Sequence, residues 1–169
     1  MKRMSNTVTL WWVPADTANF DPSAPSASAL TEERNISCAV VSGFTLNPTD
    51  SDTDGTTSIC NNSNVSTPTF YNYEGNITFF RQAEGDDFDE TAAYARAFEF
   101  FKHPDADGWW VQRTGYSQST AAAAGQSVRV FKFSSDNPQD VVPDDGGPIQ
   151  FTVAFLPQGE MFLDVDLTA

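Results

Sequence analysis

Alternation of apolar and polar positions dominates this sequence and predicts a protein built mainly from β-strands. Between Tyr71 and Phe80, apolar Tyr71, Tyr73, Ile77 and Phe79 alternate with polar residues, as in a half-buried strand. Similar apolar rows are Val8–Leu10–Trp12, Cys38–Val40–Phe44–Leu46, Phe151–Val153–Phe155 and Met161–Leu163–Val165–Leu167. With further strands expected at 109–113 and 127–133, the total is about seven, a number suited to a sandwich or barrel.

One segment instead has the period of an amphipathic helix. Apolar residues at i, i+3, i+4 and i+7 form a stripe made of Tyr94, Ala97, Phe98 and Phe101. Asp87 with Glu90 fits a capping box at its start, and Pro104 predicts its end near His103. The expected fold class is therefore mainly β with one helix (α+β), a β-sandwich or barrel flanked by an α-helix.

Two segments fit no regular element. Residues 14–35 are rich in Pro, Ala and Ser, with a short helix expected near Leu30, and residues 47–68 are small and polar. Loops of this length are uncommon inside compact domains and are usually functional or disordered. The length of 169 residues favours one domain, 1–169, with an extended N-terminal arm at 14–35 and a long loop at 47–68 that contacts neighbours. Unordered surface is the alternative for both segments.

The charge and the cysteine content narrow the class of protein and its cellular compartment. The net charge is −14, from 23 acidic and 9 basic residues, so the basic footprint of a nucleic-acid binder is missing. No apolar run has the length of a signal core or a membrane span, which predicts a protein made in the cytoplasm. Cys38 and Cys60 are accordingly expected as reduced thiols, with Cys38 buried in an apolar strand.

The stretch DSDTDG, Asp50 to Gly55, resembles the opening of a calcium loop. The position that needs a bidentate Glu is Asn61, however, and neither flank has a helical pattern. An acidic turn is the favoured interpretation, and Asp50, Asp52 and Asp54 are weak metal candidates. The alternative function is a β-sandwich binding module that recognises sugar, with calcium held by these carboxylates and with exposed Trp109 and Trp110 as its platform.

No constellation of residues predicts catalysis. His103 is the single histidine and has no evident partners, and no phosphate loop, CxxC or nucleophile elbow occurs. The clustered carboxylates of Asp86, Asp87, Asp89 and Glu90 are expected to be solvated. The sequence therefore predicts neither an enzyme nor a cofactor.

The run from Cys38 to Arg81 resembles the tail tube, or major tail, proteins of long, non-contractile-tailed bacteriophages. The resemblance lies in TLNPTDSDTD, then SIC, then TPTFYNYEG entering a strand that ends in FFR. It extends over roughly residues 36–167 and the TVTLWWVP start. A neck or tail-terminator ring of a phage is a neighbouring alternative.

This resemblance implies a structural protein of the virion tail, made in the host cytoplasm, that self-assembles into stacked hexameric rings. The resulting hollow tube would deliver genomic DNA without binding it specifically, and the acidic charge would keep phosphates from sticking. Implied partners are other copies of the chain and the tape-measure, tail-terminator and distal tail proteins. Candidate inter-subunit contacts are Asn47, Pro48, Thr49, Asp50, Asp52, Asp54, Cys60, Asn64, Tyr71 and Tyr73. Asp164 and Asp166 are candidates for facing the bore.

Overall fold

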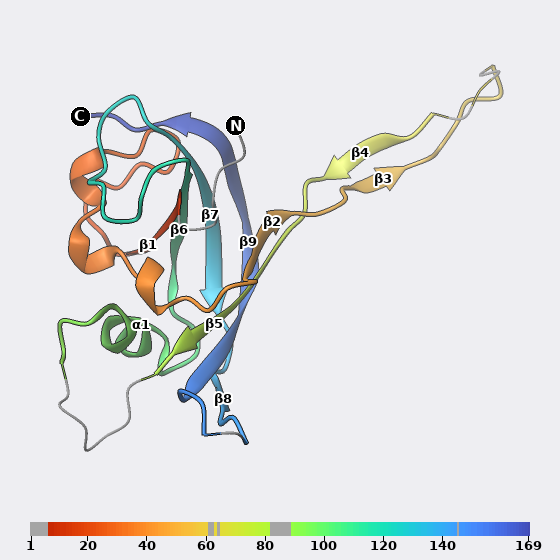
Figure 1. Ribbon diagram of the computed structural model, residues 1–169. Helices are drawn as coiled ribbons and strands as arrows, with labels where there is room; N and C mark the ends of the chain where they lie inside the picture. Colours follow the sequence, from red (N-terminus) through yellow and green to blue (C-terminus); the bar gives the residue numbers. More distant parts are fainter. Residues whose placement is uncertain (1–6, 61–62, 64, 82–88, 145) are drawn as a thin grey trace.

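The computed structural model describes residues 7–60, 63, 65–81, 89–144 and 146–169, and it consists mostly of β-strands with one α-helix (Figure 1). The strands are β1 (Val8–Pro14), β2 (Thr45–Pro48), β3 (Asp52–Asp54), β4 (Thr67–Phe70), β5 (Tyr73–Phe80), β6 (Asp107–Thr114), β7 (Ser127–Ser135), β8 (Gln139–Val141) and β9 (Gln150–Asp166). The helix is α1 (Ala93–Phe101), and short 3-10 turns are η2 (Ala27–Ala29), η3 (Glu32–Arg34) and η4 (Ser37–Ala39). The predicted class, mainly β with one helix, is confirmed.

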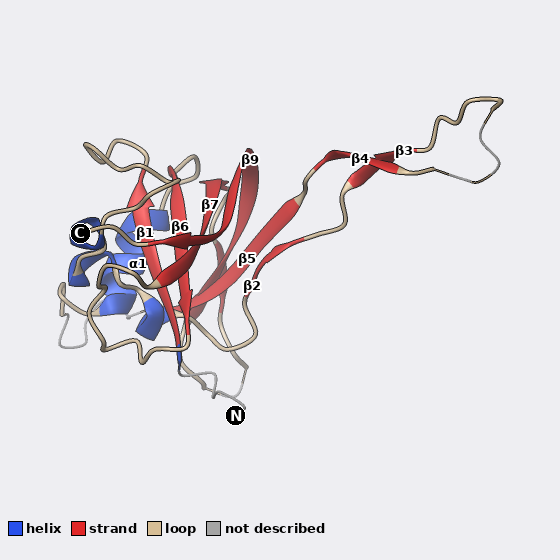
Figure 2. Cartoon of the chain, turned by 90° about the horizontal axis from the view of Figure 1, so that it is seen from above, coloured by secondary structure: helices blue, strands red, loops and turns tan. Residues whose placement is uncertain are grey.

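Seven strands form one antiparallel sheet in the order β1-β6-β7-β9-β5-β2, with β8 paired to β9. Figure 2 shows the sheet from above, with the helical segments gathered around its β1 end. The strands expected at 109–113 and 127–133 are β6 and β7, and they pair along most of their length. β3 and β4 form a separate two-stranded ribbon.

The sheet is covered on both faces, because successive residues of β1 are buried on opposite sides. Leu10 and Trp12 join a first core cluster, and Trp11 and Val13 join a second. The first cluster lies under α1, whose predicted stripe packs as expected: Ala97 and Phe101 are buried, and Tyr94 and Phe98 pack against the cluster. The ring of Phe101 lies 5.0 Å from that of Trp12, between centroids. Helix and sheet therefore share one aromatic core.

The second cluster lies under residues 14–35, the segment predicted as an extended arm. Leu30 is buried in this cluster and Phe20 packs against it, so the segment folds back onto its own sheet. Residue 35 also bridges to β1, and the backbone N–H of Ile36 donates to the carbonyl of Leu10 over 3.1 Å. The short helix expected near Leu30 takes the form of η2 and η3.

Arg113 on β6 is fully buried and organises the loop that follows its strand. Its guanidinium donates to the carbonyls of Ser117, Thr120 and Ala121, over 3.2, 2.6 and 3.1 Å. It also donates to Thr9 Oγ1 and Gln126 Oε1, and its charge lies over the ring of Trp11. Desolvation by burial lowers the pKa of Arg113. A strand residue thus provides the donors for three carbonyls of this loop.

The boundaries of α1 differ from the prediction. The helix begins at Ala93 after Ala92, which provides no side-chain cap, so Glu90 lies outside the helix and forms no capping box. Asp87 lies outside the described residues, as does Asp86. The carboxylate of Asp89 accepts instead from the backbone N–H of Thr91, which forms a local turn before the helix. The helix ends at Phe101.

Cys38 is neither in a strand nor buried, which corrects the prediction for the row that starts there. It lies in the turn η4 and is exposed, and β2 begins only at Thr45. The cause is local, because Ser37 Oγ accepts from the backbone N–H of Leu10 over 2.8 Å and donates to Asn35 Oδ1 over 2.6 Å. These side-chain bonds hold the chain in a turn where alternation predicted a strand.

The two final apolar rows belong to one strand, β9, whose register shifts twice against β7. Asp164 has a positive φ of 61°, and Leu163 beside it is exposed. Phe162, which lies between members of the predicted apolar row, packs against the second core cluster. The extra residues of the bulges break the period of two, so the row predicted from Met161 to Leu167 is wrong. Met161 packs against the first core cluster, whereas Val165 and Leu167 lie with the second.

Candidate functional site: a projecting hairpin arm

A hairpin arm, residues 49–72, projects from the sheet at the ends of β2 and β5 (Figures 1 and 2). Its strands β3 and β4 are antiparallel, and the register slips between Asp52 and Thr53. Most of the segment predicted as an irregular loop, 47–68, is therefore this arm, while Asn47 and Pro48 belong to β2. In its described part the arm is a two-stranded ribbon that leaves the body of the subunit.

The side chains of the arm bond mainly to the arm itself. Asn72 Nδ2 donates to the carbonyl of Asp50 over 3.2 Å and to Asp52 Oδ1 over 3.0 Å. Thr69 Oγ1 donates to the carbonyl of Asp52 over 3.1 Å. At the root, the backbone N–H of Thr49 donates to the carbonyl of Asn72 over 2.9 Å. These bonds join parts of the arm to each other and not to the body.

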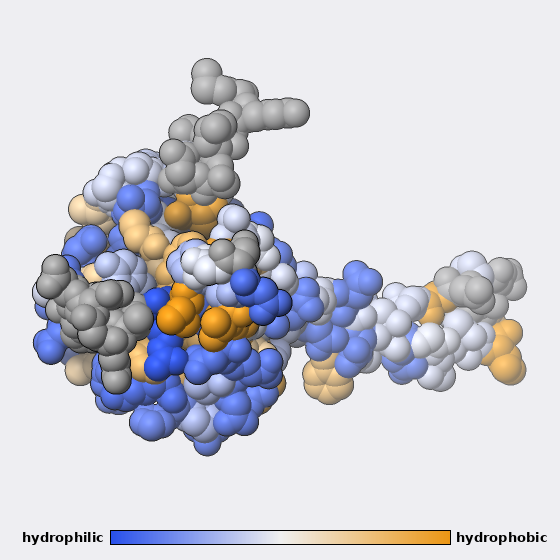
Figure 3. Space-filling view, turned by 60° about the horizontal axis from the view of Figure 1, so that its bottom comes forward, coloured by the Kyte–Doolittle hydropathy of each residue, from blue (hydrophilic) through white to orange (hydrophobic). Residues whose placement is uncertain are grey.

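The arm is exposed on all sides and carries apolar side chains that nothing in the subunit covers. Ile59 near its tip is 104% exposed, Phe70 is 69% exposed and Tyr71 is 73% exposed. Figure 3 shows hydrophobic atoms at the end of the arm, well away from the body. Every residue from 52 to 60 is exposed, including the free Cys60. A ribbon this short has little stability of its own in water, so its apolar tip indicates a partner surface.

The arm is acidic along one strand. It carries Asp50, Asp52 and Asp54 and contains no Lys, Arg or His. The hydroxyl of Thr56 and its backbone N–H both donate to Asp54 Oδ1, over 2.6 and 2.9 Å, and these bonds lower the pKa of Asp54. Within the described ranges, no three acidic, His or Cys side chains come together as metal ligands. The three carboxylates are spread along the strand instead.

Tyr73 anchors the root of the arm. Its hydroxyl donates to the carbonyl of Lys132 over 2.7 Å and accepts from the backbone N–H groups of Gln158 and Glu160 over 3.0 and 3.1 Å. Burial raises the pKa of Tyr73. Because Tyr73 is only 4% exposed, it lies inside the subunit and offers no contact surface, unlike the exposed Tyr71.

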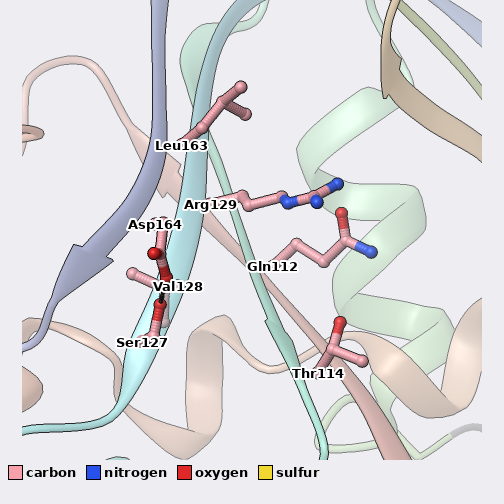
Figure 4. A pocket seen from close by; sticks show the side chains of 7 residues that line it. All are labelled: Gln112, Thr114, Ser127, Val128, Arg129, Leu163 and Asp164. Carbon is pink, nitrogen blue, oxygen red and sulfur yellow. Dashed lines mark hydrogen bonds between the residues drawn. The ribbon is translucent and has the colours of Figure 1, made fainter.

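A depression on the body is a second candidate binding surface, which no sequence pattern predicted. It has a volume of about 570 Å³ and is lined by Gln112, Thr114, Ser127, Val128, Arg129, Leu163 and Asp164 (Figure 4). Gln112 and Arg129 face each other across β6 and β7 in register. Ser127 Oγ donates to the carboxylate of Asp164, while Asp166 is exposed opposite Ser127 at the end of β9. Only the register of β6, β7 and β9 brings these side chains together, so no local motif marks them.

The remaining residues that were considered as functional candidates do not form a site in the described part of the chain. Trp109 and Trp110 are 8% and 0% exposed, so the proposed sugar platform is buried in the two core clusters. His103 is exposed after the helix end. Asn64 lies outside the described residues. The described helices include none with the length and apolar character that crossing a bilayer requires.

The fold and the arm together define a β-rich subunit with an exposed projecting hairpin. The family described as phage tail tube protein matches residues 2–169, and the chain belongs to this family. No curated protein sequence matches the chain. The protein is thus a structural component of a phage tail, in agreement with the resemblance seen between Cys38 and Arg81.

Proposed function

We propose that this chain assembles into stacked hexameric rings that form the hollow tail tube through which phage DNA reaches the host. The observation that carries the proposal is the hairpin arm. Its bonds are internal and its apolar tip is fully exposed, and both features are expected of an element that becomes buried between subunits. The membership of the tail tube family supports the same conclusion.

The edges of the sheet add a second support. The outer edge of β1 is closed by residues 35–37 of the same chain, whereas β2 ends the strand path on the other side. An open edge strand is a template for pairing with another chain. In the proposed ring, strands of adjacent subunits meet near β2, and the arm rooted there reaches a further subunit.

The proposed contacts between subunits are the predicted contact residues that are not buried in the subunit. They are Asn47 and Pro48 at the root of the arm, and Thr49, Asp50, Asp52, Asp54, Cys60 and Tyr71 in the arm itself. Asp164 and Asp166 stay predictions as bore-facing residues, and a net charge of −14 per chain is compatible with DNA that slides past without being held. The whole chain, 1–169, acts as one unit, with the tape-measure, tail-terminator and distal tail proteins as partners in the virion.

Electron microscopy of the purified chain at rising concentration tests this function. Hollow tubes or stacked rings that persist in chelator are expected, and image averages give the ring symmetry. The matched variant replaces residues 50–71 with a two-residue turn, because the arm makes few contacts with the body. This variant should fold with unchanged thermal stability and should fail to stack. A wild-type chain that stays monomeric at all concentrations, or an armless chain that forms normal tubes, contradicts the proposal.

A further inference from the structure

Arg129 is unusual among the cationic side chains that the structure describes, since it is the only Lys or Arg there with no bonded partner. Arg81, Lys102 and Lys132 form ion pairs with carboxylates. Arg34, Arg96 and Arg113 donate to carbonyl oxygens. Arg129 is exposed on β7 and points into the depression described above.

A buried acceptor lies beside this cation. Gln112 Oε1 is buried and accepts no hydrogen bond, which is costly for a polar atom removed from water. In Figure 4 the side chains of Gln112 and Arg129 extend in the same direction, and the Asp164–Ser127 pair lies on the other side. Asp164 is the one carboxylate lining the depression, and it is bonded to Ser127. An unpaired donor and an unpaired acceptor thus stand together on one face of the sheet.

The neighbouring surface changes from charged to apolar. A second depression, of about 390 Å³, is lined mainly by apolar residues that include Val8, Val40 and Phe44. The two depressions adjoin, because Val8 on β1 pairs with Thr114 on β6. From Arg129 on β7 to Val8 on β1 the surface crosses two strand spacings, roughly 10 Å.

Along the arm, charged residues are likewise followed by an apolar residue. Its acidic strand, residues 50–54, comes first and its apolar tip with Ile59 follows. An extended chain covers about 3.3 Å per residue, so the seven steps from Asp52 to Ile59 reach up to roughly 23 Å. The arm is therefore long enough to lie across both depressions, and its charge is opposite to that of Arg129.

We propose that the acidic strand of the arm of one copy docks on a second copy, with its carboxylates on Arg129 and a backbone N–H donating to Gln112 Oε1. The apolar tip then lies over Val8, Val40 and Phe44. This contact rests on the assembly proposed above, in which the two depressions of one subunit bind the arm of another. The arm and the depressions are different surfaces, so the contact is heterologous and repeats from subunit to subunit.

Charge reversal tests the contact in the full-length chain. Arg129→Glu should raise the critical concentration for assembly at least tenfold, whereas Lys102→Glu, with the same change in charge at another exposed site, should shift it less than twofold. Adding Asp52→Arg to Arg129→Glu should restore assembly to within about threefold. Sedimentation velocity measures all four chains, and thermal melts confirm that each variant is folded.

Cross-linking gives a second, independent readout. With Cys38 and Cys60 replaced by Ser, chains carrying only Asp52→Cys are mixed with chains carrying only Arg129→Cys. Oxidation after assembly should give a disulfide-linked dimer of one chain of each kind, and Lys102→Cys in place of Arg129→Cys should not. A wild-type chain that never assembles overturns the proposed function. Tubes that form equally well with Arg129→Glu and with Lys102→Glu, without the specific cross-link, overturn this inference alone.

Discussion

The body of the subunit buries its aromatic residues, whereas the arm exposes residues of the same kind. In the body, Phe101 is fully buried among Trp12, Phe79 and Trp110. In the arm, Phe70 is 69% exposed. The body is thus complete as a folded unit, while the arm presents unsatisfied surface. Stability should depend on the first region and assembly on the second, and matched substitutions can separate the two.

The largest effect on stability is expected for Phe101→Ala. Removing this ring leaves a cavity between the helix and the sheet, at a cost of about 3–5 kcal/mol in the free energy of unfolding. Phe70→Ala is the matched control and should change that free energy by less than about 0.5 kcal/mol. Urea denaturation of the two monomeric variants measures both. Similar losses for the two would show that the arm contributes to the fold of the body.

Arg113→Met should cost at least about 2 kcal/mol, because the carbonyls of Ser117, Thr120 and Ala121 lose their donor. Arg129→Met, on the adjacent strand, removes an exposed side chain and should leave stability within about 0.5 kcal/mol. Hydrogen exchange should also accelerate across residues 115–126 in the first variant only. Unchanged exchange there would contradict the role assigned to Arg113.

Tyr73→Phe should cost about 1–3 kcal/mol, since two backbone N–H groups in the β9 bulge lose their acceptor. Tyr71→Phe, two residues away and exposed, should have no effect. Burial raises the pKa of Tyr73, so the folded chain keeps the phenol proton at pH values where the unfolded chain releases it. Stability should therefore fall as pH rises above about 10, and fall less steeply in Tyr73→Phe. Denaturation curves at several pH values check the slope.

The smallest effect is expected inside the arm. Asp54→Ala removes the acceptor for the hydroxyl and the backbone N–H of Thr56, which lie at the surface. The free energy of unfolding should not change measurably, while the amide of Thr56 should exchange faster with solvent. A clear loss of global stability would mean that the hairpin and the body unfold as one unit.

The same contrast explains what could be read from the sequence. Alternation located β5, because one face of this strand is buried and burial places apolar residues at every second position. β6 is buried on both faces over Trp109–Val111 and has a continuous apolar run there instead. The arm strands have no buried face, so Asp52–Thr53–Asp54 carries no such pattern, and a hairpin was predicted as an irregular loop. Turn η4 and the bulges of β9 depend on side-chain bonds and pairing register, which periodicity does not encode. The depression around Arg129 joins three strands distant in sequence and was missed for that reason.

The placement of tryptophan has a consequence for optical experiments. All four tryptophans lie on β1 and β6, and the most exposed of them, Trp109, is only 8% exposed. Their emission will therefore report loss of the fold, with Trp12 and Trp110 close enough to couple at 5.2 Å between ring centroids. The arm contains no tryptophan, and it is spectroscopically silent when tryptophan is excited at the red edge of its absorption, where Tyr71 does not absorb. A Tyr71→Trp chain would add an emitter on the arm, and its blue shift on burial would separate the kinetics of subunit joining from those of folding.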